Sequence, residues 1–300
     1  MPDLAELAQR FAAHLGEARQ FSRSTAESYA RDLKAFVAAM RAQGIEEAAR
    51  VEPRHIAAYL TGLREAGRAP ASVARAASGI RAFFRYAASE LKAIGMDPAA
   101  HVRLPKPERK PPRILSEQET ARLLETPDER NPSGLRDRAM LELLYATGIR
   151  AGELIGLDVE DVDLRLGFVR CAGPGGRERF IPLGKAAAEA VGRYLREGRP
   201  HLARPDKPER ALFLSRRGGR LTRQGFWKLL KKHAASSGLD GVSPHSLRHA
   251  FAAHLVAGGA DLRAVQEMLG HKDIAATRMY AQLRRPSLKS VYESAHPRAR

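Results

Sequence analysis

The segment SPHSLRHAFAAHL, residues 243–255, predicts a helix over residues 244–257, because a proline suits the first position of a helix. His245 and His249 stand four residues apart, a spacing that zinc-binding helices also use. No glutamate lies between them and no cysteine cluster accompanies them, so the sequence argues against a zinc site. Arg248, between the two histidines, is the basic residue from which the functional interpretation starts.

Two other segments carry residues of the same chemical kind. In ATGIRAGEL (146–154), Gly148 ends a strongly apolar predicted helix, and Arg150 follows that break. In the second segment His271 follows Leu269-Gly270, and Tyr280 stands nine residues later. Each of these side chains alone would be taken for an ordinary surface or packing residue.

Together the five side chains form a complete set for phosphoryl transfer. Two arginines, Arg150 and Arg248, can hold one phosphate through paired hydrogen bonds and fixed charge. Two histidines, His245 and His271, can donate hydrogen bonds or move protons near neutral pH. The hydroxyl of Tyr280 can attack phosphorus and form a covalent intermediate. The fixed cations would stabilise the transition state, so no metal is expected.

The sequence predicts a mainly α-helical fold with a small β-hairpin. Residues 1–105 contain four amphipathic helical patterns, which favour a four-helix bundle. Residues 106–113 form a basic, proline-rich linker, and residues 114–300 form a mixed α/β domain. Within that domain, residues 167–171 and 178–183 predict a hairpin and residues 211–214 a short strand. Further helices are expected near its end, over residues 222–236, 261–269, 272–282 and 286–294.

The charge of the chain points to a polyanionic partner such as double-stranded DNA. Lys and Arg number 51 against 34 Asp and Glu, which gives a formal net charge of +17. A basic surface without a nucleic-acid partner is the alternative that charge alone leaves open. The single cysteine, Cys171, fits a reducing cytosol. The N-terminal residues lack the pattern of a signal peptide, and no apolar run is long enough to span a membrane, so we expect a cytoplasmic protein with no membrane partner.

These motifs resemble the tyrosine recombinases, the phage integrase family, and in particular its XerC- and XerD-like members. The resemblance covers almost the whole chain and rests on five stretches: ATGIRAGELIGL (146–157), ERFIPLG (178–184), SPHSLRHAFAAHL (243–255), GADLRAVQEMLGHKDIAATRMYAQL (259–283) and AHPRA (295–299). It implies an N-terminal core-binding domain that clamps DNA and a C-terminal catalytic domain.

The resemblance also implies a role for each residue of the set. Arg150 and Arg248 correspond to the two phosphate-clamping arginines, His245 and His271 to the active-site histidines, and Tyr280 to the nucleophile. The implied reaction gives a 3′-phosphotyrosyl link and a free 5′-hydroxyl, and needs neither ATP nor a metal cofactor. Four protomers, alike or of two kinds, would exchange strands on paired sites through a Holliday junction.

One position departs from the family pattern. The family places a catalytic lysine in the hairpin turn, whereas this chain has Pro174 there. Proline cannot protonate the departing 5′-oxygen. Arg177 and Arg179 stand nearby, but an arginine holds its proton too firmly to be a good acid, although it can stabilise charge. Three interpretations remain open: a recombinase with a weakened acid step, a cleavage-impaired variant, or a DNA-binding partner of another recombinase.

The expected partners follow from the same resemblance. A Xer-type role would resolve chromosome or plasmid dimers with a second Xer recombinase and a DNA translocase, and a mobile-element integrase is the alternative. Residues 286–294 are expected to dock onto a neighbouring protomer, or else to pack on their own domain. Basic residues outside the set are candidates for contacts with DNA: Arg75, Arg81, Arg85, Arg177, Arg179, Arg223 and Lys228.

Overall fold

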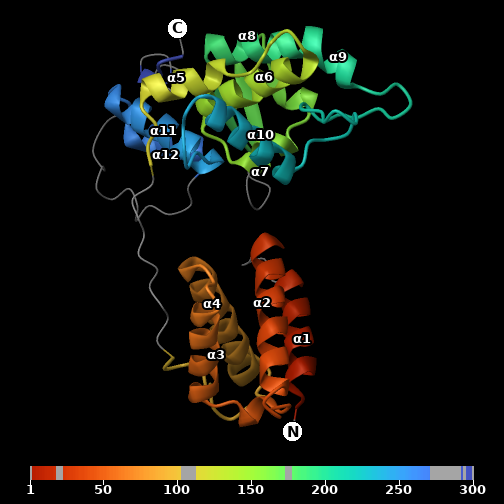
Figure 1. Cartoon of the computed structure of the whole chain (residues 1–300), viewed down its shortest axis with the longest axis vertical. Coiled ribbons are helices and arrows are strands. Elements are labelled where there is room, and N and C mark those ends of the chain that lie inside the picture. The colour runs from red at the N-terminus through yellow and green to blue at the C-terminus, as the bar shows by residue number, and fades with distance from the viewer. Residues whose placement is uncertain are drawn as a thin grey trace. The chain divides into compact units, whose positions relative to one another are not determined.

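The chain folds into two compact units. The computed structural model describes residues 2–17, 23–102, 113–172, 178–270, 292 and 295–298. Unit 1 comprises residues 1–110 and unit 2 residues 111–300 (Figure 1). The division between Lys110 and Pro111 falls inside the segment for which the sequence predicts a linker.

Unit 1 is a helical bundle, as the sequence predicts. Its α-helices are α1 (Leu4–Glu17), α2 (Arg23–Arg41), α3 (Pro53–Glu65) and α4 (Pro70–Arg85). A 3-10 turn (Ala48–Arg50) precedes α3, and a π-helical turn (Tyr86–Glu90) follows α4. Phe36, Phe83 and Phe84 are fully buried and meet edge to face in the centre of the bundle.

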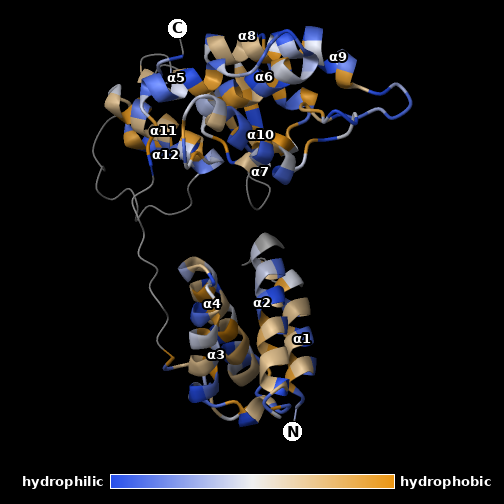
Figure 2. Cartoon of the chain, in the orientation of Figure 1, coloured by the Kyte–Doolittle hydropathy of each residue, from blue (hydrophilic) through white to orange (hydrophobic). Residues whose placement is uncertain are grey.

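Unit 2 is built mostly from helices around one that is buried over most of its length. Its helices are α5 (Glu117–Glu125), α6 (Pro132–Thr147), α7 (Ala151–Gly156), α8 (Lys185–Arg193), α9 (Arg199–Leu202), α10 (Arg223–Ser236), α11 (Pro244–Ala257) and α12 (Leu262–Leu269). A 3-10 turn (Val159–Asp161) follows α7, and a π-helical turn (Tyr194–Gly198) joins α8 to α9. Buried residues occur on every side of α6, and hydrophobic stretches run along the helices of both units (Figure 2). Helix α6 therefore forms the centre against which its neighbours pack.

A small antiparallel sheet lies beside these helices. Its order is β1-β2-β3, with β1 at Val162–Asp163, β2 at Phe168–Ala172 and β3 at Glu178–Pro182. The register pairs Val169 with Ile181, and both side chains are fully buried. The mainly α fold with a small sheet is thus confirmed. The strand expected at residues 211–214 is wrong, because Ala211 and Leu214 each make only an isolated bridge.

The described residues near the C-terminus pack onto their own chain. Tyr292 is 1% exposed, and its hydroxyl accepts a hydrogen bond from the Gly184 N–H at 3.2 Å. The His296 ring stacks on Tyr292. Arg298 pairs with the buried carboxylate of Glu142 at 2.7 Å. The packing of Tyr292 on its own domain fits the second of the two alternatives for the tail, and docking onto a neighbouring protomer stays a prediction. The helices expected at 272–282 and 286–294 fall almost wholly outside the described residues.

The contact between Arg298 and Glu142 predicts a measurable loss of stability. Burial raises the pKa of Glu142, and Arg298 and Arg138 are the cations that keep its carboxylate compensated. We expect Arg298→Ala to lower the free energy of unfolding of unit 2 by about 2 kcal/mol in urea titrations, since Arg138 remains. Arg193→Ala is the control, because Arg193 pairs with Glu129 at the surface and should cost less than about 1 kcal/mol. Equal losses in the two variants would contradict the structural role of the tail.

Candidate active site

Arg150 lies at the corner between α6 and α7. Gly148 ends α6 in the left-handed conformation, with φ of 59°, and its N–H donates to the Leu144 carbonyl. A side chain at this position would also collide with Phe251, because a Cβ would lie 2.3 Å from its ring. Only glycine therefore fits both the turn and the packing, and the turn places the partly exposed Arg150 just before α7.

Arg248 projects from α11 into the same corner and is only 7% exposed. Its guanidinium donates to the Gly148 carbonyl and, at 2.7 Å, to the Leu269 carbonyl. Burial, together with the positive charge of Arg150, lowers the pKa of Arg248 to about 10. The side chain stays charged at neutral pH, and a buried cation near another cation is suited to an anionic ligand.

Glu153 joins Arg150 to a third arginine. Its carboxylate accepts from the Arg150 N–H at 2.7 Å and from the Arg150 guanidinium at 3.1 Å. Arg179, on β3, donates to both oxygens of the same carboxylate at 3.0 and 2.8 Å. Burial alone would raise the pKa of Glu153, but the hydrogen bonds from Arg179 and Arg150 lower it. Glu153 is therefore an ionised link between the two arginines.

The C-terminal end of α12 receives all three arginines. Three successive carbonyl oxygens accept hydrogen bonds there: Met268 from Arg179 at 3.0 Å, Leu269 from Arg248 at 2.7 Å and Gly270 from Arg150 at 3.4 Å. The last carbonyls of a helix carry a partial negative charge, so cations are stabilised beside them. These contacts place the arginines directly before residue 271.

The four side chains leave an excess of positive charge. Arg150, Arg179 and Arg248 contribute three cations, and Glu153 contributes one anion. Arg150 retains 38% exposure of its side chain, whereas Arg179 retains 14%. The corner can thus accept a phosphate through Arg150 and Arg248.

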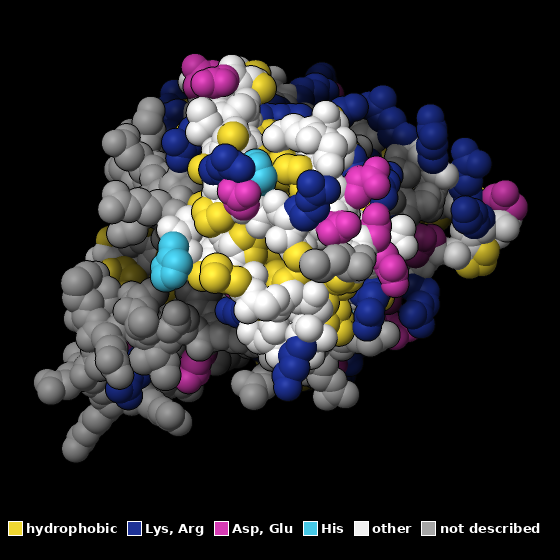
Figure 3. Space-filling view, turned by 90° about the horizontal axis from the view of Figure 1, so that it is seen from below, with side chains coloured by type: hydrophobic (Ala, Val, Ile, Leu, Met, Phe, Trp, Pro, Cys, Tyr) yellow, Lys and Arg dark blue, Asp and Glu magenta, His cyan; other side chains and the backbone are white. Residues whose placement is uncertain are grey.

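The histidines and the tyrosine of the predicted set are placed to different degrees. His245 lies in the first turn of α11, is exposed, and stands three residues before Arg248. His249 is also exposed. Its partial burial, together with the nearby His245 and Arg248, lowers the pKa of its imidazole. Figure 3 shows Lys and Arg side chains in dark blue, scattered among acidic and hydrophobic ones on the face that it draws. His271, Tyr280, Pro174 and Arg177 lie outside the described residues.

The candidates for DNA contact fall into two groups. Arg75 makes a two-point ion pair with Asp32 at 2.8 and 3.1 Å, and Arg81 donates to the Val102 carbonyl at 2.6 Å. Arg85, Arg223 and Lys228 are exposed, as is Arg75. Arg223 lies against α7, since a Cβ on Gly152 would come within 2.5 Å of its guanidinium.

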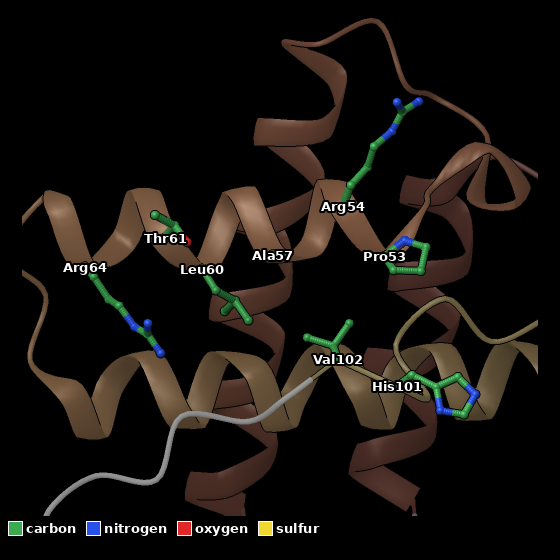
Figure 4. A pocket seen from close by; sticks show the side chains of 8 residues that line it. All are labelled: Pro53, Arg54, Ala57, Leu60, Thr61, Arg64, His101 and Val102. Atoms are coloured by element: carbon green, nitrogen blue, oxygen red, sulfur yellow. The ribbon is translucent and has the colours of Figure 1, made fainter.

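Unit 1 contains a pocket of about 410 Å³ between α3 and the residues that precede the linker (Figure 4). Leu60 and Val102 line it, with Arg64 and His101 at its edge. Arg54 also borders the pocket but pairs with Glu52. None of the predicted catalytic residues lies there.

Among the described residues, no helix is long and apolar enough to span a membrane. Within the same residues, no cluster of His, Cys, Asp and Glu is suited to a metal ion.

Glu153 is not among the site residues predicted from the sequence, and its pairing with Arg179 was not predicted either. Glu153 stands three residues after Arg150, so the first turn of α7 brings the two side chains together. This spacing is the feature of the sequence from which the contact could have been predicted. Arg179 is one of the candidates for DNA contact, and its guanidinium pairs with Glu153. No local signal could show this, since the two residues are 26 positions apart.

Comparisons with known proteins agree with this geometry. The family model "Phage integrase family" matches residues 113–285, and "Phage integrase, N-terminal SAM-like domain" matches residues 8–91. The chain is 46% identical over 283 residues to "Tyrosine recombinase XerD" of Halalkalibacterium halodurans, covering 94% of each chain. It is 41% identical to the protein of the same name from Mycobacterium tuberculosis, over the full length of both.

Solved structures show the same fold. The Tn1549 transposon integrase in complex with circular intermediate DNA matches 95% of this chain and 97% of its own, with a TM-score of 0.74 and 19% identity. A lambda integrase tetramer bound to a Holliday junction matches 95% of this chain and 80% of its own, with a TM-score of 0.71 and 22% identity. The chain belongs to the phage integrase family and is a tyrosine-type site-specific recombinase. Its sequence is similar to XerD proteins throughout.

The turn at Gly148 makes a prediction about the arginine corner. In Gly148→Ala, the left-handed backbone and the overlap with Phe251 should together lower the free energy of unfolding of unit 2 by at least about 2 kcal/mol. Gly156→Ala is the control, since a Cβ there meets no atom within 4 Å. Thermal unfolding would measure both variants. A Gly148→Ala protein as stable as Gly156→Ala would show that the turn does not depend on glycine.

Proposed function

We propose that this recombinase cleaves and rejoins DNA strands with Tyr280 as the nucleophile. The observation that supports it most is the meeting of Arg150 and Arg248 at the end of α12, immediately before His271 in the chain. Two cations with a local excess of positive charge are what the phosphate of a strand-transfer reaction requires.

In the proposed mechanism the arginines act first. Arg150 and Arg248 hold the scissile phosphate, and His245 and His271 donate hydrogen bonds to its oxygens or move protons. The hydroxyl of Tyr280 attacks phosphorus and the 5′-oxygen leaves, which gives a 3′-phosphotyrosyl link and a 5′-hydroxyl. Attack by the 5′-hydroxyl of a partner strand then releases Tyr280. The phosphodiester energy is kept in the covalent link, so ATP is not consumed.

The proposed substrate is a pair of short recombination sites bound by four protomers. Similarity to XerD over the whole chain favours resolution of chromosome or plasmid dimers in the cytoplasm, with a second Xer recombinase and a DNA translocase as partners. A mobile-element integrase with the same chemistry is the alternative. Pro174 favours one further candidate, a DNA-binding partner that is itself impaired in cleavage.

Trapping of the covalent intermediate tests this proposal. A nicked duplex that carries the recombination site loses its 5′-hydroxyl fragment after cleavage, so the enzyme cannot reverse the reaction. We expect a protein–DNA adduct on denaturing gels, without added metal or ATP. Tyr280→Phe should form no adduct, while its affinity for the same duplex should stay unchanged. An adduct of equal yield in Tyr280→Phe would assign the nucleophile to another residue.

The substitution at position 174 predicts a defect in protonation of the leaving group. General acids typically contribute about 10²–10⁴-fold, so Pro174→Lys should raise the single-turnover cleavage rate by up to that range. A substrate with sulfur at the 5′-bridging position needs little protonation. It should therefore accelerate cleavage more by the natural chain than by Pro174→Lys. Equal acceleration in the two proteins would refute the defect.

A further inference from the structure

We propose that Arg179 is a positioning residue that holds the phosphate-clamping arginines and the end of α12 in one geometry. This inference rests on the function proposed above. Arg179 lies on β3, the strand that follows the hairpin turn, whereas Arg150 and Arg248 lie on helical segments. Its contacts join β3 to Glu153 of α7 and to Met268 of α12.

The contacts of Arg179 use three of its five N–H donors. Two point at Glu153, one at each carboxylate oxygen, at 3.0 and 2.8 Å. The Nε–H donates to the Met268 carbonyl at 3.0 Å. The pairing with Glu153 is bidentate, a geometry that only the planar fork of arginine provides. Arg179 therefore fixes both the direction of Glu153 and the last turn of α12.

Glu153 passes this constraint on to the clamp. The same carboxylate accepts from the backbone N–H and the guanidinium of Arg150. Although burial works against the charged form, the hydrogen bonds and charge of Glu153 raise the pKa of Arg179. Without Arg179, Glu153 would be free to neutralise Arg150 in another geometry, and Arg150 would lose its orientation towards a phosphate.

Gly270 supplies independent evidence for a close fit around Arg179. It ends α12 in the left-handed conformation, with φ of 63°. A Cβ at this position would lie 3.2 Å from three atoms of the Arg179 guanidinium. The helix end thus leaves just enough room for the arginine, and the next residue in the chain is His271. A shift of Arg179 would therefore disturb Gly270 at the end of α12.

Arg179 is not suited to replace the general acid that Pro174 cannot supply. Its side chain is 14% exposed and is already committed to Glu153 and Met268. It acts on the reaction through Arg150 and α12. Its removal should therefore slow cleavage and leave the affinity for DNA nearly unchanged.

Single-turnover cleavage of the nicked duplex tests this inference, with binding measured in parallel on the same duplex. We expect Arg179→Met to slow cleavage by about 10²-fold, the cost typical of a misplaced reacting group, with the dissociation constant for DNA changed less than about threefold. Arg179→Lys keeps the charge but loses the planar fork, so its cleavage rate should lie between those of the natural chain and Arg179→Met. Rates are compared well below the unfolding temperature of each protein.

Arg170→Met is the matched control. Arg170 lies on the neighbouring strand β2 and also forms an ion pair with a carboxylate: its Nε–H and one Nη–H donate to a single oxygen of Asp161, at 3.1 and 2.8 Å. Its cleavage rate should stay within about threefold of the natural chain. An equal loss in Arg170→Met and Arg179→Met would show a general effect of the sheet and overturn the positioning role.

A second pair of variants tests the inference where Arg179→Met does not fold. Gly270→Ala presses on Arg179, whereas Gly238→Ala has the same left-handed backbone, with φ of 68°, at a site where a Cβ meets nothing within 4 Å. Gly270→Ala should slow cleavage more than Gly238→Ala does. Equal rates in these two variants would overturn the inference.

Failure of the proposed function would show differently. If the natural chain forms no Tyr280 adduct, either Tyr280 is not the nucleophile or the chain does not cleave this duplex. Amide hydrogen exchange then tests the positioning role of Arg179 by itself. Arg179→Met should speed exchange in residues 150–154 and 262–270, and Arg170→Met should not. Unchanged exchange in both segments would overturn the positioning role.

Discussion

Three arginines share the last carbonyl oxygens of one helix, and the geometry of the active-site corner depends on this contact. Arg179, Arg248 and Arg150 would repel one another in a low-dielectric setting. The negative end of the α12 dipole and the carboxylate of Glu153 offset that repulsion. The same arrangement fixes the last turn of α12 up to Gly270.

The apolar framework explains how such a costly cluster persists. Helix α6 is buried on all sides, and its end at Gly148 packs against Phe251 of α11. This packing holds the carbonyl of Gly148 where Arg248 can bond to it. Burying an arginine weakens a protein unless its donors are satisfied, and here helix ends satisfy them. The core therefore sets the geometry of the clamp.

The sequence predicts the parts of the site that local pattern controls. The helix break at Gly148 and the proline at the start of α11 locate Arg150, His245 and Arg248. Contacts across the fold are different. The pairing of Arg179 with Glu153 depends on the register of β3, which no local pattern shows. The segment at Ala211–Leu214 has the composition of a strand, but it has only single-bridge partners, one of them Asp158.

The contact of Arg298 with Glu142 spans 156 positions of the chain. On a ribosome, residue 142 leaves the exit tunnel long before residue 298 does. During that interval the Glu142 carboxylate has only Arg138 as a described partner. Unit 1 can finish folding in the meantime, because its core draws only on its own helices. A nascent chain would thus acquire a complete core in unit 1 well before unit 2 could close, which delays strand-cleaving competence until residue 298 has left the exit tunnel.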